Sequence, residues 1–99
     1  MLAAVRAAAL ELAESEESEE SARSVESAGG GGPVWTRAGA RFAVLRGATL
    51  DLRVGSAIAA AALRTPDTNP ATEGPDWIAF DPPVLDGHAL DRMAAWFGA

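Results

Sequence analysis

The 99-residue chain contains no cysteine and no lysine, and His88 is its single histidine. The absence of cysteine excludes disulfides, thiolate metal sites, iron–sulfur clusters and cysteine nucleophiles. A chain without disulfides suits a reducing compartment, so we expect a cytoplasmic protein. The run GGGGP at residues 29–33 is not followed by Gly-Lys-Ser/Thr and is therefore no phosphate loop. We expect no cofactor.

Long apolar runs are also missing. No stretch reaches the roughly 18 residues that a membrane-spanning helix needs. The first residues, MLAAVRAAALELAE, carry glutamates within their apolar face, whereas a secretion signal has a basic start and an uncharged apolar run. We therefore expect no membrane segment and no membrane partner.

Large apolar side chains are scarce. The hydrophobic share is 48%, but alanine supplies 23 of these residues and only 25 are Leu, Ile, Val, Met, Phe or Trp. A single small domain must bury most of these to offset the entropy that folding costs. The three tryptophans and three phenylalanines are therefore needed first for the core.

Charge is unevenly distributed along the chain, which has a net charge of −6. The first 26 residues and the last 35 are acidic, whereas residues 27–64 carry five arginines and one aspartate. The overall acidity argues against non-specific binding of nucleic acid. The arginine-bearing middle keeps a local form of that hypothesis open.

The pattern divides one domain into three parts. Apolar residues at helical spacing among alanines and glutamates predict an N-terminal helix over residues 1–20. Residues 21–32, together with the Ser/Glu run before them, are low in complexity and predict a flexible acidic and Gly-rich segment. Residues 33–99 are expected to form an α+β core.

Within the core, the apolar period changes to two. Residues 34–37, 40–46 and 49–54 predict three adjacent antiparallel strands, separated by turns at 38–39 and 47–48. In the third strand, Leu50, Leu52 and Val54 should face the core, and Asp51 should face the other side.

Two helices and a fourth strand complete the expected core. Ser56 is the expected N-cap of a short helix over 55–64, whose Ile58, Ala62 and Leu63 should point inward. Residues 65–75 read as a loop, and 76–80 as a strand that is apolar on both faces. Asp86 should cap a last helix.

That last helix should bury an apolar stripe: Leu90, Met93, Ala94 and Phe97. The order α-β-β-β-α-β-α then predicts a four-stranded antiparallel sheet with helices packed on one face.

Three motifs carry a family resemblance over residues 33–97. Phe42-Ala43, Leu50-Asp51-Leu52-Arg53 and Asp76-Trp77-Ile78 are similar to the strands of the small bacterial "luciferase domain" family of uncharacterised proteins. The layout also resembles the double-wing fold of MmcQ/YjbR-like proteins, through Pro33, Trp35, Gly39, Phe42 and Ala43. The resemblance implies a fold and brings no catalytic residue. The acidic run before the first strand and the alanine-rich middle helix depart from both patterns.

The arginines are the most informative polar residues. Four of them could form a basic face or rim on the sheet: Arg37, Arg41, Arg46 and Arg53. Such a surface would contact an anion or, in the manner of a wing, nucleic acid. Alternatively, these are solvated arginines that pair with Asp51 and the N-terminal glutamates, at roughly 0–1 kcal/mol for each pair.

No catalytic or metal-binding residue is predicted. His88, with Asp86 and Asp91, lacks a third strong metal ligand, and we expect an exposed imidazole beside a helix cap. Asp76 and Asp81 bracket a strand and should point to opposite faces, so they form no acid–base pair.

Three functional hypotheses follow. The preferred one is a small non-catalytic binding or accessory module, whose partner is a protein or a second copy of the chain. The alternatives are a weak YjbR-like binder of nucleic acid that uses the arginine hairpins, and an enzyme. The enzyme would have its pocket between the sheet and the C-terminal helix, lined by Trp35, Trp77, His88 and Trp96.

Overall fold

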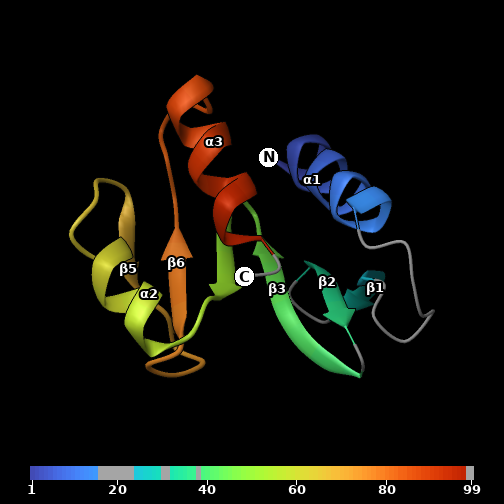
Figure 1. Ribbon diagram of the computed structural model, residues 1–99, viewed down its shortest axis with the longest axis horizontal. Helices are drawn as coiled ribbons and strands as arrows, with labels where there is room; N and C mark the ends of the chain where they lie inside the picture. Colours follow the sequence, from blue (N-terminus) through green and yellow to red (C-terminus); the bar gives the residue numbers. More distant parts are fainter. Residues whose placement is uncertain (16–23, 30–31, 38, 98–99) are drawn as a thin grey trace.

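A computed structural model describes residues 1–15, 24–29, 32–37 and 39–97 (Figure 1). The described residues form three helices and six strands, which confirms the α+β class. In chain order the elements are α1 (Leu2–Ser15), β1 (Ser24–Gly29), β2 (Gly32–Arg37), β3 (Ala40–Arg46), β4 (Thr49–Arg53), α2 (Ser56–Ala62), β5 (Thr68–Pro70), β6 (Trp77–Phe80) and α3 (Gly87–Trp96).

The strands form one antiparallel sheet in the order β1-β2-β3-β4-β6-β5. The predicted meander is present as β2, β3 and β4, and β2 and β3 are joined through residues 38–39 as expected. The sheet has six strands, not the predicted four. The two additional strands, β1 and β5, lie at the edges of the sheet. They contain few residues of the types that favour strands.

Strand β1 lies where a flexible segment was predicted over residues 21–32. No strand was predicted there, and Ser24–Gly29 pair in register with Gly32–Arg37. Residues 16–23 and 30–31 lie outside the described part of the chain. Local sequence could not reveal β1, because the strand depends on hydrogen bonds to β2 and on a contact distant in sequence, between Glu26 and Arg6 of α1.

Strand β5 lies inside the predicted loop over residues 65–75. Thr68 hydrogen-bonds to Thr65 at 3.0 Å, and Arg92 of α3 donates a 2.8 Å hydrogen bond to the carbonyl of Pro66. These contacts hold the segment beside β6, where a three-residue strand forms.

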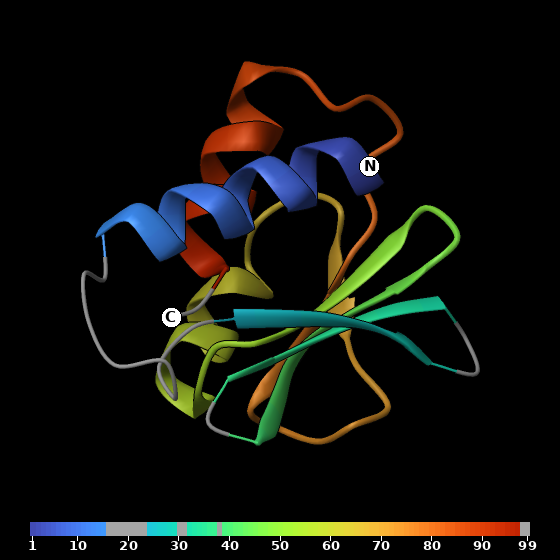
Figure 2. The ribbon, with the colours of Figure 1, turned by 90° about the vertical axis from the view of Figure 1, so that its right-hand side faces the viewer.

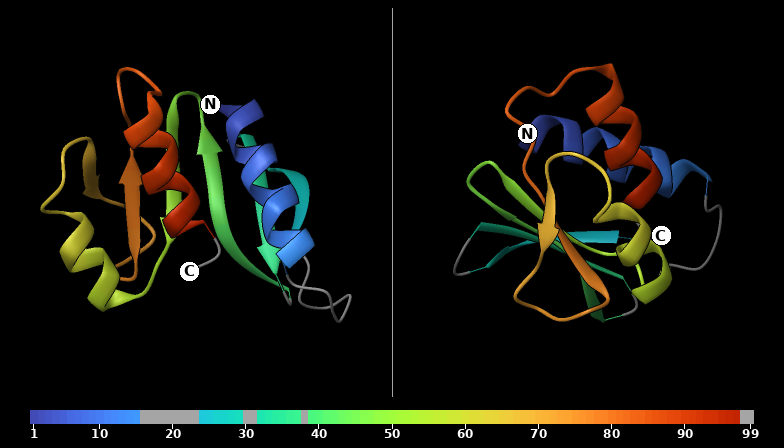
Figure 3. Two further views of the ribbon diagram at one scale, coloured as in Figure 1. Left: turned by 45° about the horizontal axis from the view of Figure 1, so that its top comes forward. Right: turned by 90° about the vertical axis from the view of Figure 1, so that its left-hand side faces the viewer.

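All three helices lie on one side of the sheet, as predicted (Figures 2 and 3). The core between the two layers includes Trp35, Leu50, Leu52, Ile78 and Phe80, each at most 1% exposed. Val5 and Ala8 of α1 and Met93 of α3 close it from the helical side. None of the helices in the described ranges has the length and apolarity to span a membrane.

Three details of α2 and α3 differ from the prediction. Ser56 is not the cap of α2: the N-cap is Gly55, without a side-chain hydrogen bond. Ile58 and Leu63 are 41% and 40% exposed, because α2 buries its alanines instead. Of the predicted stripe, Met93 and Phe97 are buried, whereas Leu90 and Ala94 are exposed and Ala89 is buried instead. The expected cap Asp86 is confirmed by a 2.8 Å hydrogen bond from the backbone N–H of Ala89.

A β-bulge interrupts β3. Trp35 pairs with Ala43 and Thr36 pairs with Arg41, so Phe42 is the additional residue. Phe42 and Ala43 are consecutive, yet both are buried in the core. The Phe42 ring packs edge-on to Phe97 at 4.9 Å between centroids. Because of the bulge, Arg41 lies on the side of the sheet away from the helices.

We call that side the outer face. Residues directly paired across strands share a face, so the pairs Val44–Asp51, Asp51–Ala79 and Arg53–Trp77 all lie on it. The β5–β6 loop reaches over this face, since its Glu73 contacts Arg46 of β3. None of the three described helices covers this face (Figure 2).

Candidate anion-binding cleft

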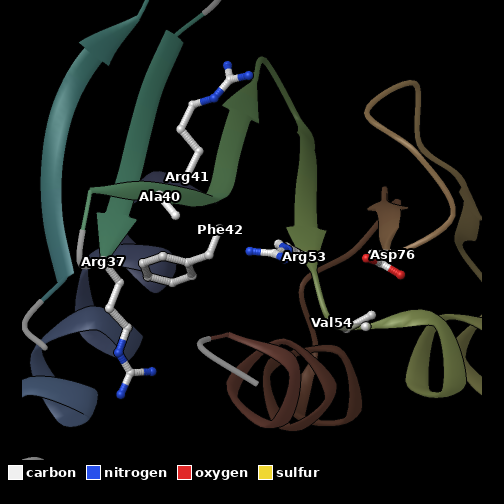
Figure 4. Close-up of a pocket in the computed structure, with 8 residues that line it drawn as sticks. Arg37, Ala40, Arg41, Phe42, Arg53, Val54 and Asp76 are labelled. Atoms are coloured by element: carbon white, nitrogen blue, oxygen red, sulfur yellow. The ribbon is translucent and has the colours of Figure 1, made fainter.

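Two adjoining hollows lie where four strands end together. The first has a volume of about 300 Å³ and the second about 340 Å³, and both are lined by Arg41, Arg53 and Asp76. We call the two hollows together the arginine cleft. Figure 4 shows Arg53 and Asp76 on either side of the end of β4, with Arg41 extending upward and Arg37 at the lower left.

The antiparallel order of the sheet brings these residues together. Arg37 ends β2 and Arg53 ends β4, whereas Arg41 lies near the start of β3 and Asp76 directly precedes β6. Antiparallel neighbours place the end of one strand beside the start of the next. Residues far apart in sequence therefore meet at one end of the sheet.

Arg41 and Arg53 are exposed, and neither forms a hydrogen bond or ion pair with any residue that the structure describes. Arg37 is half-buried, lines only the first hollow and makes an interaction of its own. The cleft thus presents two guanidinium groups whose charge no described side chain neutralises. Guanidinium groups bind carboxylate and phosphate through paired N–H donors.

The backbone holds Asp76 in position. Its carbonyl accepts hydrogen bonds from the N–H of Val54 at 2.9 Å and of Gly55 at 3.0 Å. The N–H of Trp77 donates to the carbonyl of Gly74 at 3.1 Å, which closes the turn before β6. The Asp76 side chain, by contrast, has no hydrogen-bond partner among the described residues.

The fourth predicted arginine, Arg46, lies at the opposite end of β3. Its Nη1 donates a 2.8 Å hydrogen bond to Oδ2 of Asp51, and its Nη2 lies 3.4 Å from Oε2 of Glu73. Arg46 is therefore the solvated, paired arginine of the alternative prediction. The structure brings together Arg37, Arg41 and Arg53 of the predicted set and separates Arg46 from them.

Asp51 is a buried carboxyl group on the outer face, 3% exposed. Burial, followed by the adjacent Glu73 carboxyl, raises the pKa of Asp51 to about 6, and Arg46 opposes this shift. Because Arg46 of β3 contacts the carboxyl groups of both Asp51 and Glu73, it links the β5–β6 loop to the sheet. It is a structural contact beside the cleft.

The predicted pocket between the sheet and α3 is filled by side chains. Trp35 is 1% exposed and packs edge-on to Phe97 at 6.1 Å, and Trp96 packs against Phe80 at 5.5 Å. Trp77 lies on the other face of the sheet, opposite Arg53. His88 is exposed in the first turn of α3. These four residues do not meet in one site.

Asp76 and Asp81 stand at opposite ends of β6, in keeping with the prediction that they form no pair. The sequence reasoning dismissed Asp76 with that pair and missed its place beside the arginines. It also missed Glu73 as the partner of Arg46. Nothing in the local pattern identifies either residue, because each contact joins residues at least 20 positions apart.

Comparison of the chain with family models, with curated proteins and with solved structures finds no match.

Proposed function

We propose that the chain is a non-catalytic cytoplasmic binding module whose ligand carries an anionic group and binds in the arginine cleft. The observation that carries this proposal is the pair Arg41 and Arg53: both line both hollows, and neither is neutralised by a described side chain. Solvated arginines on an acidic protein ordinarily find carboxylate partners, as Arg6 does with Glu26 and Arg46 with Asp51. Two arginines beside one cleft without a described partner are typical of a site whose ligand supplies the negative charge.

The absence of cysteine supports the proposed compartment, and the packed interior supports the non-catalytic role. The space beneath α3, where an enzyme pocket was predicted, holds aromatic rings in edge contact. The resemblance to luciferase-domain and YjbR-like proteins is retained as a proposal about fold kinship, on which the binding role does not depend.

Binding of nucleic acid draws less support from the same cleft. A wing that follows a phosphate backbone needs several arginines in a row. Arg46 is already held by Asp51 and Glu73, and Asp76 and Glu73 add negative charge beside Arg53.

The test is a titration of the ¹⁵N-labelled protein with 3-phenylpropionate, followed by NMR. A probe of about a dozen non-hydrogen atoms at about 0.3 kcal/mol each should bind with a Kd of roughly 2–4 mM. Saturable shifts are expected at residues 53–55 and 74–77. Because a charge-assisted hydrogen bond contributes about 1.5–3 kcal/mol, Arg53→Gln should weaken binding about tenfold or more.

Arg64→Gln is the matched control. Arg64 is exposed, lies outside the cleft and has no described side-chain partner. Equal binding by wild type and Arg53→Gln, or shifts confined to other parts of the molecule, would refute the proposed function.

A further inference from the structure

One carboxylate in the arginine cleft has no ion-pair partner among the residues that the structure describes. Asp76 lines both hollows together with Arg41 and Arg53, yet no ion pair joins it to either arginine. Glu73 also lines the second hollow, but Arg46 lies 3.4 Å from its Oε2. Among the described residues, two guanidinium groups and one carboxylate of the cleft therefore have no side-chain partner.

This combination disfavours a ligand that is only an anion. A fixed carboxylate beside the arginines repels a second negative group and lowers the affinity that the arginines provide. A ligand that also carries an ammonium group turns the same carboxylate into a hydrogen-bond and ion-pair acceptor. Asp76 would then select between the two kinds of ligand.

The backbone at Asp76 is held in place before any ligand binds. Two hydrogen bonds, from Val54 and Gly55, hold its carbonyl, and the turn from Gly74 to Trp77 is closed by a third. A group that is already in place loses little conformational entropy on binding, which raises its contribution to affinity. Figure 4 shows the Asp76 carboxylate and the Arg53 side chain on either side of the end of β4.

The second hollow also has an apolar wall. Trp77 is half-buried, stands directly opposite Arg53 in the sheet and lines the hollow with Pro75. Its volume of about 340 Å³ corresponds to roughly ten water molecules, hence to a ligand of about a dozen non-hydrogen atoms. A flat apolar group of the ligand can lie against the indole.

We propose that the arginine cleft binds a small zwitterion of the amino-acid type: its carboxylate is held by Arg53 in the positive field of Arg41, its ammonium group is held by Asp76, and its apolar part lies against Trp77. This inference rests on the proposed function and names the ligand class of that site.

The test compares three probes that share one skeleton. L-Phenylalanine carries both charged groups, 3-phenylpropionate lacks the ammonium group, and phenethylamine lacks the carboxylate. We expect L-phenylalanine to bind wild-type protein at least fivefold more tightly than 3-phenylpropionate, and phenethylamine to bind more weakly than both. NMR shifts in residues 53–55 and 74–77 report the site for each probe.

The decisive variant is Asp76→Asn, which keeps the backbone carbonyl and removes the charge. The variant should bind L-phenylalanine more weakly and 3-phenylpropionate more tightly than wild type does, so that the fivefold preference disappears. Asp81→Asn is the control, because Asp81 is exposed at the far end of the same strand. Dispersed NMR spectra of both variants confirm that they are folded.

The outcomes separate this inference from the proposed function. Two results would refute the zwitterion proposal and leave the proposed anion site intact. In the first, 3-phenylpropionate binds in an Arg53-dependent manner as tightly as L-phenylalanine. In the second, Asp76→Asn leaves the preference unchanged. If no carboxylate probe binds in an Arg53-dependent manner, both proposals fail.

Discussion

Arg46 donates a 2.8 Å hydrogen bond to Asp51, a carboxyl group that is 3% exposed on the outer face of the sheet. The same guanidinium lies 3.4 Å from Glu73 of the β5–β6 loop. One arginine thus serves two carboxyl groups from two parts of the chain. The loop that it fastens continues into Asp76 and Trp77, so the wall of the arginine cleft depends on this contact.

Asp51 should make stability depend on pH. Its pKa is about 6 in the folded protein, against about 3.9 for an unperturbed aspartate, so the folded state binds the proton more tightly. The resulting stabilisation is complete below about pH 4 and is lost as the pH rises through about 6. Between those values Asp51 lowers the free energy of unfolding by roughly 1–2 kcal/mol.

Other carboxyl groups titrate in the same range, so the comparison is with Asp51→Asn. Urea denaturation at several pH values should show the Asn variant gaining roughly 1–2 kcal/mol relative to wild type between pH 4 and pH 7. A difference that does not change with pH would show that the pKa of Asp51 is not raised.

Removing Arg46 should destabilise the protein. In Arg46→Met, Asp51 and Glu73 face each other without a counter-charge, so the pKa of Asp51 rises further and roughly 1–3 kcal/mol of stability is lost at pH 7. Carboxyl ¹³C NMR measures the pKa and urea denaturation the stability. Arg64→Met, which removes an exposed arginine without a described partner, should change neither. Similar losses in the two variants would argue against the Arg46 contact.

Gly32 should tolerate no side chain. Its φ is +135°, which L-residues rarely adopt, and an added Cβ would run into the carbonyl oxygen of Leu45. Gly32→Ala should therefore cost about 3 kcal/mol or more, measured by thermal or urea unfolding. Gly39 has φ +80° but open space around it, so Gly39→Ala should cost only about 1–2 kcal/mol. If Gly32→Ala lowers stability no more than Gly39→Ala, Gly32 does not lie as close to the Leu45 carbonyl as described.

The cap of α3 should contribute measurably to stability. Asp86→Ala removes the 2.8 Å hydrogen bond to Ala89 and should lower the free energy of unfolding by about 1 kcal/mol. Asp91 is exposed in the same helix and accepts no described hydrogen bond, so Asp91→Ala should stay within about 0.5 kcal/mol of wild type. Equal effects in a denaturation series would mean that the cap contributes nothing specific.

The central part of the fold follows from local pattern. Leu50, Leu52 and Val54 alternate with polar residues, and the alternation is strong enough to predict both the strand and its buried face. Asp86 before an apolar helix predicts the α3 cap for a similarly local reason. The edge strands cannot be predicted from local pattern, because Ser24–Gly29 and Thr68–Pro70 form strands only by pairing with a neighbour.

The buried faces of short helices are harder to predict. The sequence favoured Ile58, Ala62 and Leu63 as the buried residues of α2, yet only Ala62 is buried, together with Ala59. A short connection between two strands fixes how close the helix lies to the sheet. At close approach small side chains fit and large ones turn outward.

By itself the sequence determined the fold class, the meander, the turn positions and the absence of cysteine chemistry, since each depends on residues within a few positions of one another. Only the tertiary structure decided which arginines act together. Arg41 and Arg53 meet Asp76 at one end of the sheet, while Arg46 is held by Asp51 and Glu73. Strand order, the bulge at Phe42 and the course of the β5–β6 loop set these distances, and all three arise from packing between segments distant in the chain.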